Sequence, residues 1–153
     1  MSTGYLGLAP YLYYADATAA LAWLTRTFGF TEDSRICDAT GEVFQATLCV
    51  GERRIQVAGV GPDYWAAKGV DGPVGQLTIL YVEDVDECFA RVSAILGDET
   101  ELEPPTDQPY GARVFTVADP GGNSWTFWQQ VSDDIELPPG WQVVRTGGES
   151  SNG

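Results

Sequence analysis

The chemistry that this chain can perform is limited first by the residue types that it lacks. The 153-residue sequence contains no histidine, the side chain whose ordinary pKa lies nearest neutrality and the commonest ligand of catalytic transition metals. Serine–histidine and cysteine–histidine catalysis are therefore excluded, together with most transition-metal sites. Any catalytic role must depend on carboxylates, tyrosines, cysteines, arginines or the single lysine, Lys68.

The charge balance narrows the classes of partner. Lysine and arginine total 8 against 22 aspartates and glutamates, which gives a net charge of −14. Such a chain repels phosphate backbones and anionic lipid surfaces, so we expect neither a nucleic-acid partner nor a membrane partner. No apolar run approaches the ~20 residues of a membrane span, and the first residues lack a basic segment followed by a long apolar one. A cytoplasmic location is expected.

The elements that must position any functional side chain begin with an aromatic-rich strand at 8–14. A helix follows, capped by Asp16 and ended by Gly29, with apolar residues at helical spacing between them. Three strand-like runs then alternate with turns, at 31–38, 42–50 and 53–58. Residues 59–75 are rich in glycine and proline and are predicted to be a linker.

The second half of the chain repeats this order of elements. An apolar strand at 76–82 precedes a helix that is capped by Asp84 and ended by Gly97. Three strand-like runs follow, at 100–103, 112–118 and 124–130. The two caps are separated by an offset of 68 residues, from Asp16 to Asp84, and the apolar helix positions match at the same offset. The pattern indicates an internal duplication.

The domain organisation follows from this repeat. The first module is predicted at 1–58, the linker at 59–75, the second module at 76–131 and a C-terminal tail at 132–153. The predicted fold class is α+β, with two βαβββ modules joined in one curved mixed sheet, helices outside and a concave face left open. In the tail, Trp141, Val143 and Val144 are expected to dock as an extra strand or against a partner chain, and 147–153 to be disordered.

Three stretches carry a resemblance to a known family. They are PYLYYADATAALAWLTRTFGF in the first half, ILYVEDVDECFARV in the second and, most specific, PYGARVFTVADPGGNSWTFWQ from Pro109 to Gln129. In this order they resemble the vicinal-oxygen-chelate superfamily, the group of glyoxalase I, bleomycin-resistance proteins and extradiol dioxygenases. The resemblance implies the two-module fold, a small-molecule ligand, and modules that pair or swap between chains, so a homodimer is expected.

The resemblance also implies where a metal ion would bind in the metal-dependent members. The equivalent positions in this chain are Ala9, Gln56, Leu77 and Thr126. Alanine and leucine side chains have no lone pair to offer, and neutral amide or hydroxyl oxygens are weak ligands for a divalent ion. We therefore expect neither a metal nor any other cofactor, and no metal-dependent glyoxalase or dioxygenase activity.

Strand alternation predicts most of the lining of the concave face, and Trp65 and Arg113 are added to it on other grounds. The predicted ligand-binding residues are Tyr11, Tyr13, Gln45, Gln56, Trp65, Tyr81, Arg113, Thr126 and Trp128. Alternatives stay open, because the strand aromatics could simply fill the sheet. Trp65 could close over a ligand with Tyr64 or plug the gap between the modules. Arg113 could clamp an anionic ligand or form an ion pair with Asp119 or a nearby glutamate.

An aromatic lining with neutral hydrogen-bonding groups is typical of a small-molecule pocket. The leading hypothesis is a metal-independent protein that binds or sequesters an aromatic or cationic organic molecule, as the bleomycin-resistance branch does with antibiotics. One alternative is a metal-independent isomerase or lyase that uses Tyr13, Tyr81 or a buried carboxylate as acid or base. Another is a dimeric structural or regulatory protein.

Overall fold

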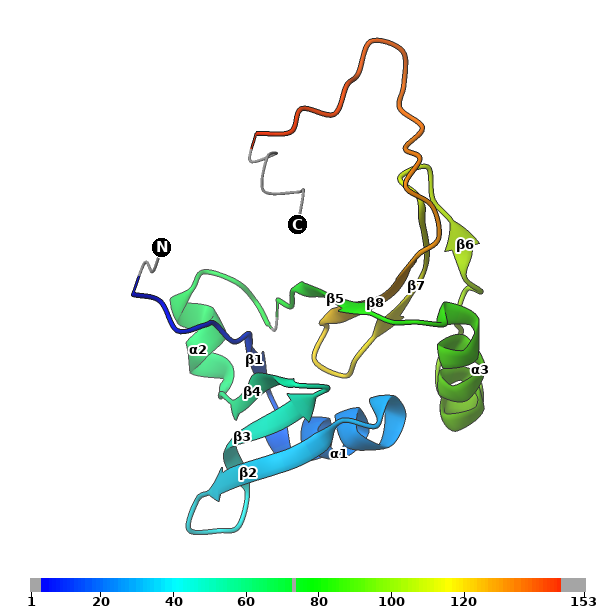
Figure 1. The fold of residues 1–153 in the computed structure, drawn as a ribbon. Helices are drawn as coiled ribbons and strands as arrows, with labels where there is room; N and C mark the ends of the chain where they lie inside the picture. The colour runs from blue at the N-terminus through cyan, green and yellow to red at the C-terminus, as the bar shows by residue number, and fades with distance from the viewer. Residues whose placement is uncertain (1–3, 73, 147–153) are drawn as a thin grey trace.

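The computed structural model describes residues 4–72 and 74–146, which form two similar modules (Figure 1). The first module consists of β1 (Tyr11–Tyr14), α1 (Ala17–Phe28), β2 (Thr31–Cys37), β3 (Val43–Val50) and β4 (Arg53–Gly59). Its strands are ordered β1-β4-β3-β2, with β1 parallel to β4 and the other neighbours antiparallel. Each element predicted for the first half is present, although the first strand begins three residues later than expected.

The second module repeats the same order. It consists of β5 (Leu77–Tyr81), α3 (Val85–Leu96), a short 3₁₀ turn (Gly97–Glu99), β6 (Thr106–Asp107), β7 (Ala112–Ala118) and β8 (Ser124–Gln130). Its strands are ordered β5-β8-β7-β6, again with one parallel pair, β5 and β8. The predicted α+β fold of two βαβββ modules is confirmed. The strand predicted at 100–103 is wrong: β6 begins only after Pro104 and Pro105, which have no N–H to donate to a ladder.

Local sequence sets the ends of the two long helices. The Asp16 and Asp84 carboxylates accept hydrogen bonds from the backbone N–H groups of Ala19 at 3.0 Å and Glu87 at 3.1 Å, and each cap satisfies a donor that the first helical turn leaves free. Gly29 ends α1 with a φ of 76°, a left-handed conformation that glycine adopts without steric penalty. The predicted caps are therefore present in both modules.

The helix-covered sides of the two sheets share one core. Leu12 and Tyr14 of β1 are buried in it. Phe28, from the end of α1, reaches Trp125 and Phe127 of β8, with ring centroids 5.4 Å apart in both pairs. Because side chains alternate along a strand, the opposite face of each sheet is left open to solvent.

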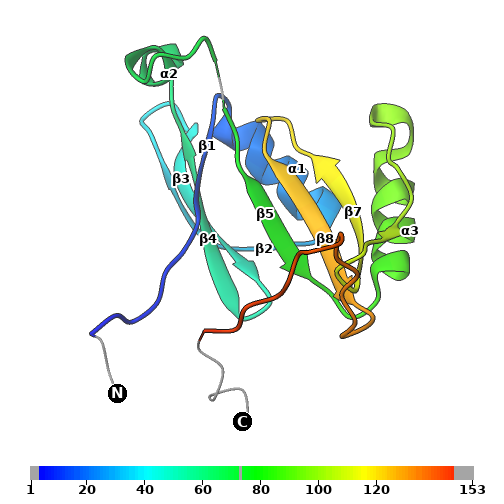
Figure 2. The same ribbon diagram turned by 90° about the horizontal axis from the view of Figure 1, so that it is seen from above.

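The two sheets meet at their edges without joining. β1 and β5 are edge strands, and the backbone ladders end at each of them. The predicted single curved sheet is therefore two four-stranded sheets that lie side by side, with α1 behind them in Figure 2. We call the boundary between β1 and β5 the seam.

A buried carboxylate connects the second module to the first. Asp119, in the turn between β7 and β8, accepts hydrogen bonds from the Tyr14 hydroxyl of β1 and from the Trp125 indole N–H at 2.9 Å. Its other oxygen accepts from the backbone N–H groups of Gly121 and Asn123 at 2.9 and 3.0 Å, which stabilises the turn. Burial, and then the hydrogen bond to Asp119, raise the pKa of Tyr14, so this hydroxyl stays protonated.

The segments outside the modules differ from the prediction. The predicted linker contains a short helix, α2 (Pro62–Ala67), with proline in its first turn, where the missing N–H does no harm. The described part of the tail forms no extra strand: Trp141, Val143 and Val144 are exposed, and the tail extends away from the modules (Figure 1). The disorder predicted for 147–153 lies outside the described residues.

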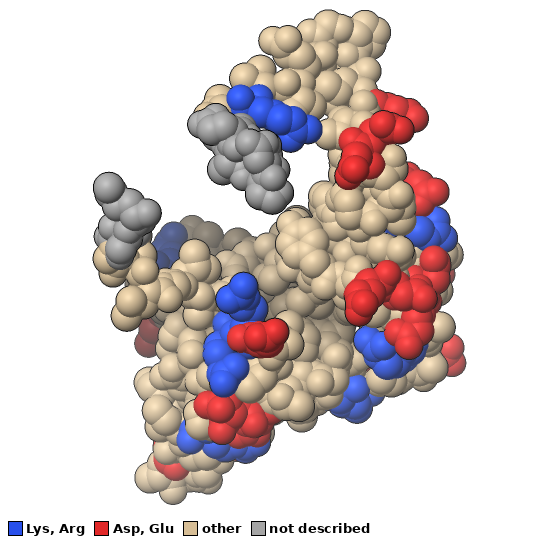
Figure 3. All heavy atoms as spheres, viewed as in Figure 1, with Lys and Arg blue, Asp and Glu red and all other residues tan. Residues whose placement is uncertain are grey.

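Charged side chains are distributed unevenly over the visible surface. Figure 3 shows acidic side chains gathered on the side of the second module and an uncharged stretch in the middle of the molecule. Asp86 and Glu87, in the first turn of α3, belong to the acidic groups of that module. Among the described residues, no helix combines the length and the apolar character needed to cross a membrane.

Candidate functional site

The first sheet brings four of the predicted lining residues to its open face. Tyr11 and Tyr13 project from β1, and Gln56 of β4 is the ladder partner of Tyr11. The Gln56 side-chain oxygen accepts hydrogen bonds from the Gln45 amide at 3.0 Å and the Thr47 hydroxyl at 2.9 Å. These three polar side chains therefore satisfy one another across β3 and β4, next to the two tyrosines.

Helix α2 adds further aromatic rings at one end of this face. The centroid of the Tyr64 ring lies 4.6 Å from that of Tyr13, and Trp65 meets Tyr13 edge-on at 6.4 Å. Tyr11 extends the cluster, with its centroid 5.1 Å from that of Tyr13. Lys68, just after the helix, places its ammonium nitrogen 5.1 Å from the centroid of the Tyr64 ring, in the geometry of a cation–π interaction.

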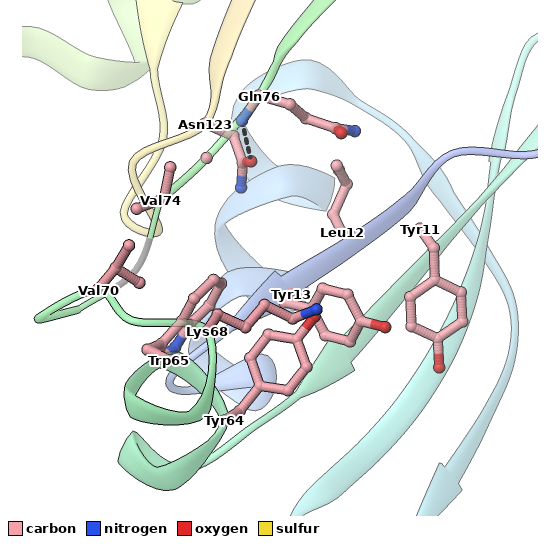
Figure 4. Close-up of a pocket in the computed structure, with 11 residues that line it drawn as sticks. Tyr11, Leu12, Tyr13, Tyr64, Trp65, Lys68, Val70, Val74, Gln76 and Asn123 are labelled. Atoms are coloured by element: carbon pink, nitrogen blue, oxygen red, sulfur yellow. Dashed lines mark hydrogen bonds between the residues drawn. The ribbon is translucent and has the colours of Figure 1, made fainter.

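A cavity of about 410 Å³ lies beside this cluster, between β1, α2, the rest of the linker and the β7–β8 turn (Figure 4). We call it the α2 pocket. Tyr13, Trp65, Lys68, Val70 and Asn123 line it. Its volume falls within the range of about 300–1,000 Å³ that is usual for small-molecule sites.

Two buried N–H donors at the α2 pocket have no partner at hydrogen-bonding geometry among the described residues. They are the indole nitrogen of Trp65 and the amide nitrogen of Asn123. The Asn123 amide oxygen accepts from the backbone N–H of Gln76 at 3.0 Å, which fixes the orientation of the amide at the pocket wall (Figure 4). That nitrogen lies near the Tyr14 hydroxyl, whose pKa it lowers, and it carries two hydrogens, of which that hydroxyl can accept only one.

The ionisation of Tyr13 limits the chemistry of the pocket. Its contact with Tyr64 raises the pKa of the Tyr13 hydroxyl, and partial desolvation raises it further. Tyr13 therefore keeps its proton at neutral pH. It can donate a hydrogen bond or a proton, but it is not available as a general base.

The predicted residues of the second module lie on a separate open face. Trp128 stacks on Tyr110 with centroids 5.1 Å apart and meets the Tyr81 ring at 6.0 Å. The Thr126 hydroxyl is hydrogen-bonded to that of Thr116 at 2.8 Å. Tyr81, Thr126 and Trp128 do not line the α2 pocket, so the structure divides the predicted set between two faces.

Arg113 lies on the helix-covered side of β7. Its guanidinium pairs with Asp86 of α3 at 3.0 Å and with Asp107 of β6 at 3.1 Å, and these two carboxylates raise its pKa. Of the two alternatives for Arg113, the ion pair is the one that the structure contains, with Asp86 and Asp107 in place of Asp119. Arg113 does not line the α2 pocket.

Comparison with known proteins defines the family. The model of the Glyoxalase/Bleomycin resistance protein/Dioxygenase superfamily matches residues 6–127. The chain belongs to this superfamily. The match spans both modules and confirms the resemblance seen in the three sequence stretches.

Solved structures and curated proteins extend this result. TioX from Micromonospora sp. ML1 is 31% identical with a TM-score of 0.65, over 82% of this chain and 100% of that one. The bleomycin-binding protein from Streptomyces verticillus, solved with copper(II)-bleomycin, is 23% identical with a TM-score of 0.59, over 82% and 97%. An uncharacterised protein of Mycobacterium bovis is 28% identical over 130 residues, 82% of this chain and 84% of that protein.

The metal site implied for metal-dependent members of the superfamily does not fit this chain. Ala9 and Leu77 offer no donor atom. The Gln56 oxygen already accepts two hydrogen bonds, and the Thr126 hydroxyl is bonded to Thr116. Within residues 4–72 and 74–146, no group of three or more histidine, cysteine or acidic side chains is arranged to hold a metal ion. No reaction step at this site is assigned to a metal.

Sequence reasoning missed part of the α2 pocket. Lys68, Val70 and Asn123 were not predicted to line a site, although Tyr64 and Trp65 were recognised. Pro62 followed by Asp63 was an available signal for a helix start, because proline and acidic residues are favoured in a first helical turn. Asn123 carries no such signal, since only the placement of the β7–β8 turn against the linker brings its amide to the pocket.

Proposed function

We propose that this protein binds and sequesters a small planar organic molecule in the α2 pocket, without a metal. The proposal rests on the convergence of the Tyr13, Tyr64 and Trp65 rings at a cavity whose wall also contains the buried N–H donors of Trp65 and Asn123. The rings supply surface for stacking, and the donors supply direction, a combination typical of ligand pockets.

The pocket suits an aromatic body that carries a hydrogen-bond acceptor. A buried donor left without a partner costs about 1–3 kcal/mol, and a carbonyl oxygen or ring nitrogen of a ligand would remove that penalty. Each aromatic pair adds about 0.5–1.5 kcal/mol beyond the area that it buries. Lys68 already occupies the cationic position over Tyr64. We therefore favour an aromatic ligand over the cationic one that the net charge alone suggests.

The superfamily context supports binding as the function. Two structures that share this fold, at 23% and 20% identity, are bleomycin-binding proteins. A lactoylglutathione lyase from Agrobacterium tumefaciens, at 23% identity, shares it as well, so the fold accommodates both binding and catalysis. The catalytic alternative with Tyr13 as a base is disfavoured here, because the raised pKa keeps that hydroxyl protonated.

The test is a titration with naphthalene carboxamide, a neutral aromatic probe with an acceptor oxygen, followed by tryptophan fluorescence and calorimetry. We expect saturable binding of one probe per chain, weakened about tenfold or more (~1.4 kcal/mol) by Tyr64→Ala. Tyr81→Ala, a matched deletion on the other face, should leave the affinity unchanged. Naphthylmethylammonium should bind less tightly, because Lys68 repels it. Binding that is lost in Tyr81→Ala but not in Tyr64→Ala would contradict the assignment.

We further propose that two chains associate, each packing its tail on the open second-module face of the other. Tyr81 on that face is 76% exposed, and Trp141 in the tail is 70% exposed. Leu77 and Ile79 are exposed on the same strand as Tyr81, and Val143 and Val144 close to Trp141. Exposed apolar side chains that cluster in this way mark interaction sites, and a two-fold exchange covers both surfaces with the same contact.

Sedimentation velocity tests this association. The wild type should sediment as a dimer at micromolar concentration, and Trp141→Ser should shift the equilibrium toward the monomer. Phe44→Ser, which removes an exposed aromatic ring from β3, serves as the matched control and should leave the dimer intact. A wild-type monomer at every concentration would rule the association out.

A further inference from the structure

A second cavity, of about 700 Å³, lies at the seam near the start of β4 and the end of β5. We call it the seam cavity. It exists because β1 begins late: the Gln56 N–H bonds to the Pro10 carbonyl at 2.9 Å, and the ladder starts with Tyr11 opposite Gln56. The first residues of β4 therefore have no strand on that side. β5, the edge strand of the other module, borders the resulting gap.

The inner wall of the seam cavity is apolar and belongs to the shared core. Phe28, Phe30, Trp125 and Phe127 line it, and their ring centroids lie 5.4–5.6 Å from one another in the contacting pairs. All four are buried, and Ile55 adds an aliphatic side chain from β4. An apolar molecule that enters here exchanges water for aromatic surface, which is favourable by about 25 cal/mol for each Å² removed from water.

The same cavity is also lined by basic side chains. Arg53, Arg54 and Arg91 contribute to it, three of the eight basic residues in a chain with 22 acidic ones. Arg91 pairs with Glu87 at 3.3 Å. Arg53 and Arg54 make no ion pair with the described residues, whereas every other arginine within the two modules does. Two unneutralised guanidinium groups therefore adjoin buried aromatic surface.

We propose that the seam cavity binds an amphipathic organic anion. Its apolar body lies against Phe28 and Phe30, and its carboxylate or sulfate head is held by Arg53 and Arg54. Guanidinium groups bind such heads through short, charge-assisted and often bidentate hydrogen bonds. The net charge of −14 repels a small anion at this site only weakly, because charges farther away than about 8 Å are largely screened at physiological ionic strength.

The proposal predicts different affinities for three ligands that have the same apolar chain and differ in their head groups. We expect decanoate to bind with one molecule per chain and at least tenfold more tightly than decanol in calorimetry, and decyltrimethylammonium to bind weakest. The double substitution Arg53→Gln and Arg54→Gln should lower the affinity for decanoate to that for decanol and leave decanol binding unchanged. Arg35→Gln, which removes an exposed arginine paired with Glu32, is the matched control and should change neither.

Two further measurements decide whether the seam cavity is the site. Neither Tyr64→Ala nor saturating naphthalene carboxamide should change the affinity for decanoate. Competition between the two ligands would place the anion in the α2 pocket. That result would overturn the seam assignment, while the proposed function would stand. Equal affinities of decanoate and decanol, or no effect of the double substitution, would overturn it as well. Sedimentation velocity gives the oligomeric state of the double variant. If the double substitution changes the oligomeric state and leaves the affinity for decanoate unchanged, the cavity is a contact between chains, and the proposal is wrong.

Discussion

The two modules have the same order of elements, yet their open faces differ. Tyr13 and Tyr81 occupy equivalent positions, separated by the same 68 residues as Asp16 and Asp84. Tyr13 packs against Tyr64 and Trp65 of α2, whereas Tyr81 is largely exposed. The cause is the linker, which occurs only once in the chain. A duplicated scaffold thus acquires this pocket through a segment that was not duplicated.

The largest expected effect on stability comes from removing a side chain of α2, the helix that packs on the open face of the first module only. Trp65 is 8% exposed, and Trp65→Ala deletes a buried ring that packs on Tyr13. We expect a loss of about 3 kcal/mol in the free energy of unfolding, measured by urea denaturation. Tyr81→Ala, which removes a ring from the equivalent position of Tyr13, should change it by less than about 0.5 kcal/mol. Similar losses in the two variants would show that the faces are equivalent after all.

The next residue along β1 sharpens the comparison. Tyr14 reaches Asp119 in the other module, whereas its equivalent, Val82, has no such group. The pKa of Tyr14 is raised above its ordinary value of 10.0. Above pH 10 the unfolded chain releases this proton while the folded chain keeps it, so stability falls as the pH rises, by up to about 1.4 kcal/mol per pH unit from this group.

Tyr14→Phe tests this linkage between pH and stability. The variant should be about 1–2 kcal/mol less stable near neutral pH, because a hydrogen bond to a charged acceptor is lost. Between about pH 10 and 11 its free energy of unfolding should then fall less steeply than that of the wild type, by the contribution of about one proton. Urea denaturation at a series of pH values measures both slopes. Parallel curves would mean that Tyr14 is not held in its protonated form by the fold.

The parts of the fold that could be predicted from the sequence are those that depend on residues close together in the chain. The aspartate caps and the apolar helix positions each depend on neighbours within a few residues, and both were read correctly. The six-residue helix α2 was missed, because so short a helix is unstable on its own and depends on tertiary contacts such as that of Trp65 with Tyr13. The strand predicted at 100–103 failed because two prolines delay pairing until Thr106.

The site was predictable only in part, for a related reason. Alternation identifies the face on which a side chain lies, and it correctly groups Tyr11 with Tyr13 and Tyr81 with Trp128. It does not say which face is covered, so it assigned all four residues to one lining. Asn123 reaches the α2 pocket through the relative placement of the two modules, which long-range contacts such as that of Tyr14 with Asp119 determine.

The smallest expected effects concern Gln56 and Thr126, two of the four positions that the superfamily resemblance assigns to a metal. Gln56→Ala leaves the Gln45 amide and the Thr47 hydroxyl without their shared acceptor, which should lower the free energy of unfolding by about 1 kcal/mol. Thr126→Val removes one exposed hydrogen bond and keeps a side chain suited to a strand, so the change should be below about 0.5 kcal/mol.

Metal binding at Gln56 and Thr126 can be tested with a chelator. Since the donors at Gln56 and Thr126 are already bonded within the protein, the thermal midpoint of the wild type should be the same with EDTA and with added Mg²⁺ or Mn²⁺. A ligand that binds only the folded chain raises its stability in proportion to the logarithm of its concentration. A metal-dependent rise in the midpoint that Gln56→Ala and Thr126→Val each abolish would therefore show that both modules contribute to a metal centre, and the asymmetry between them would be structural only.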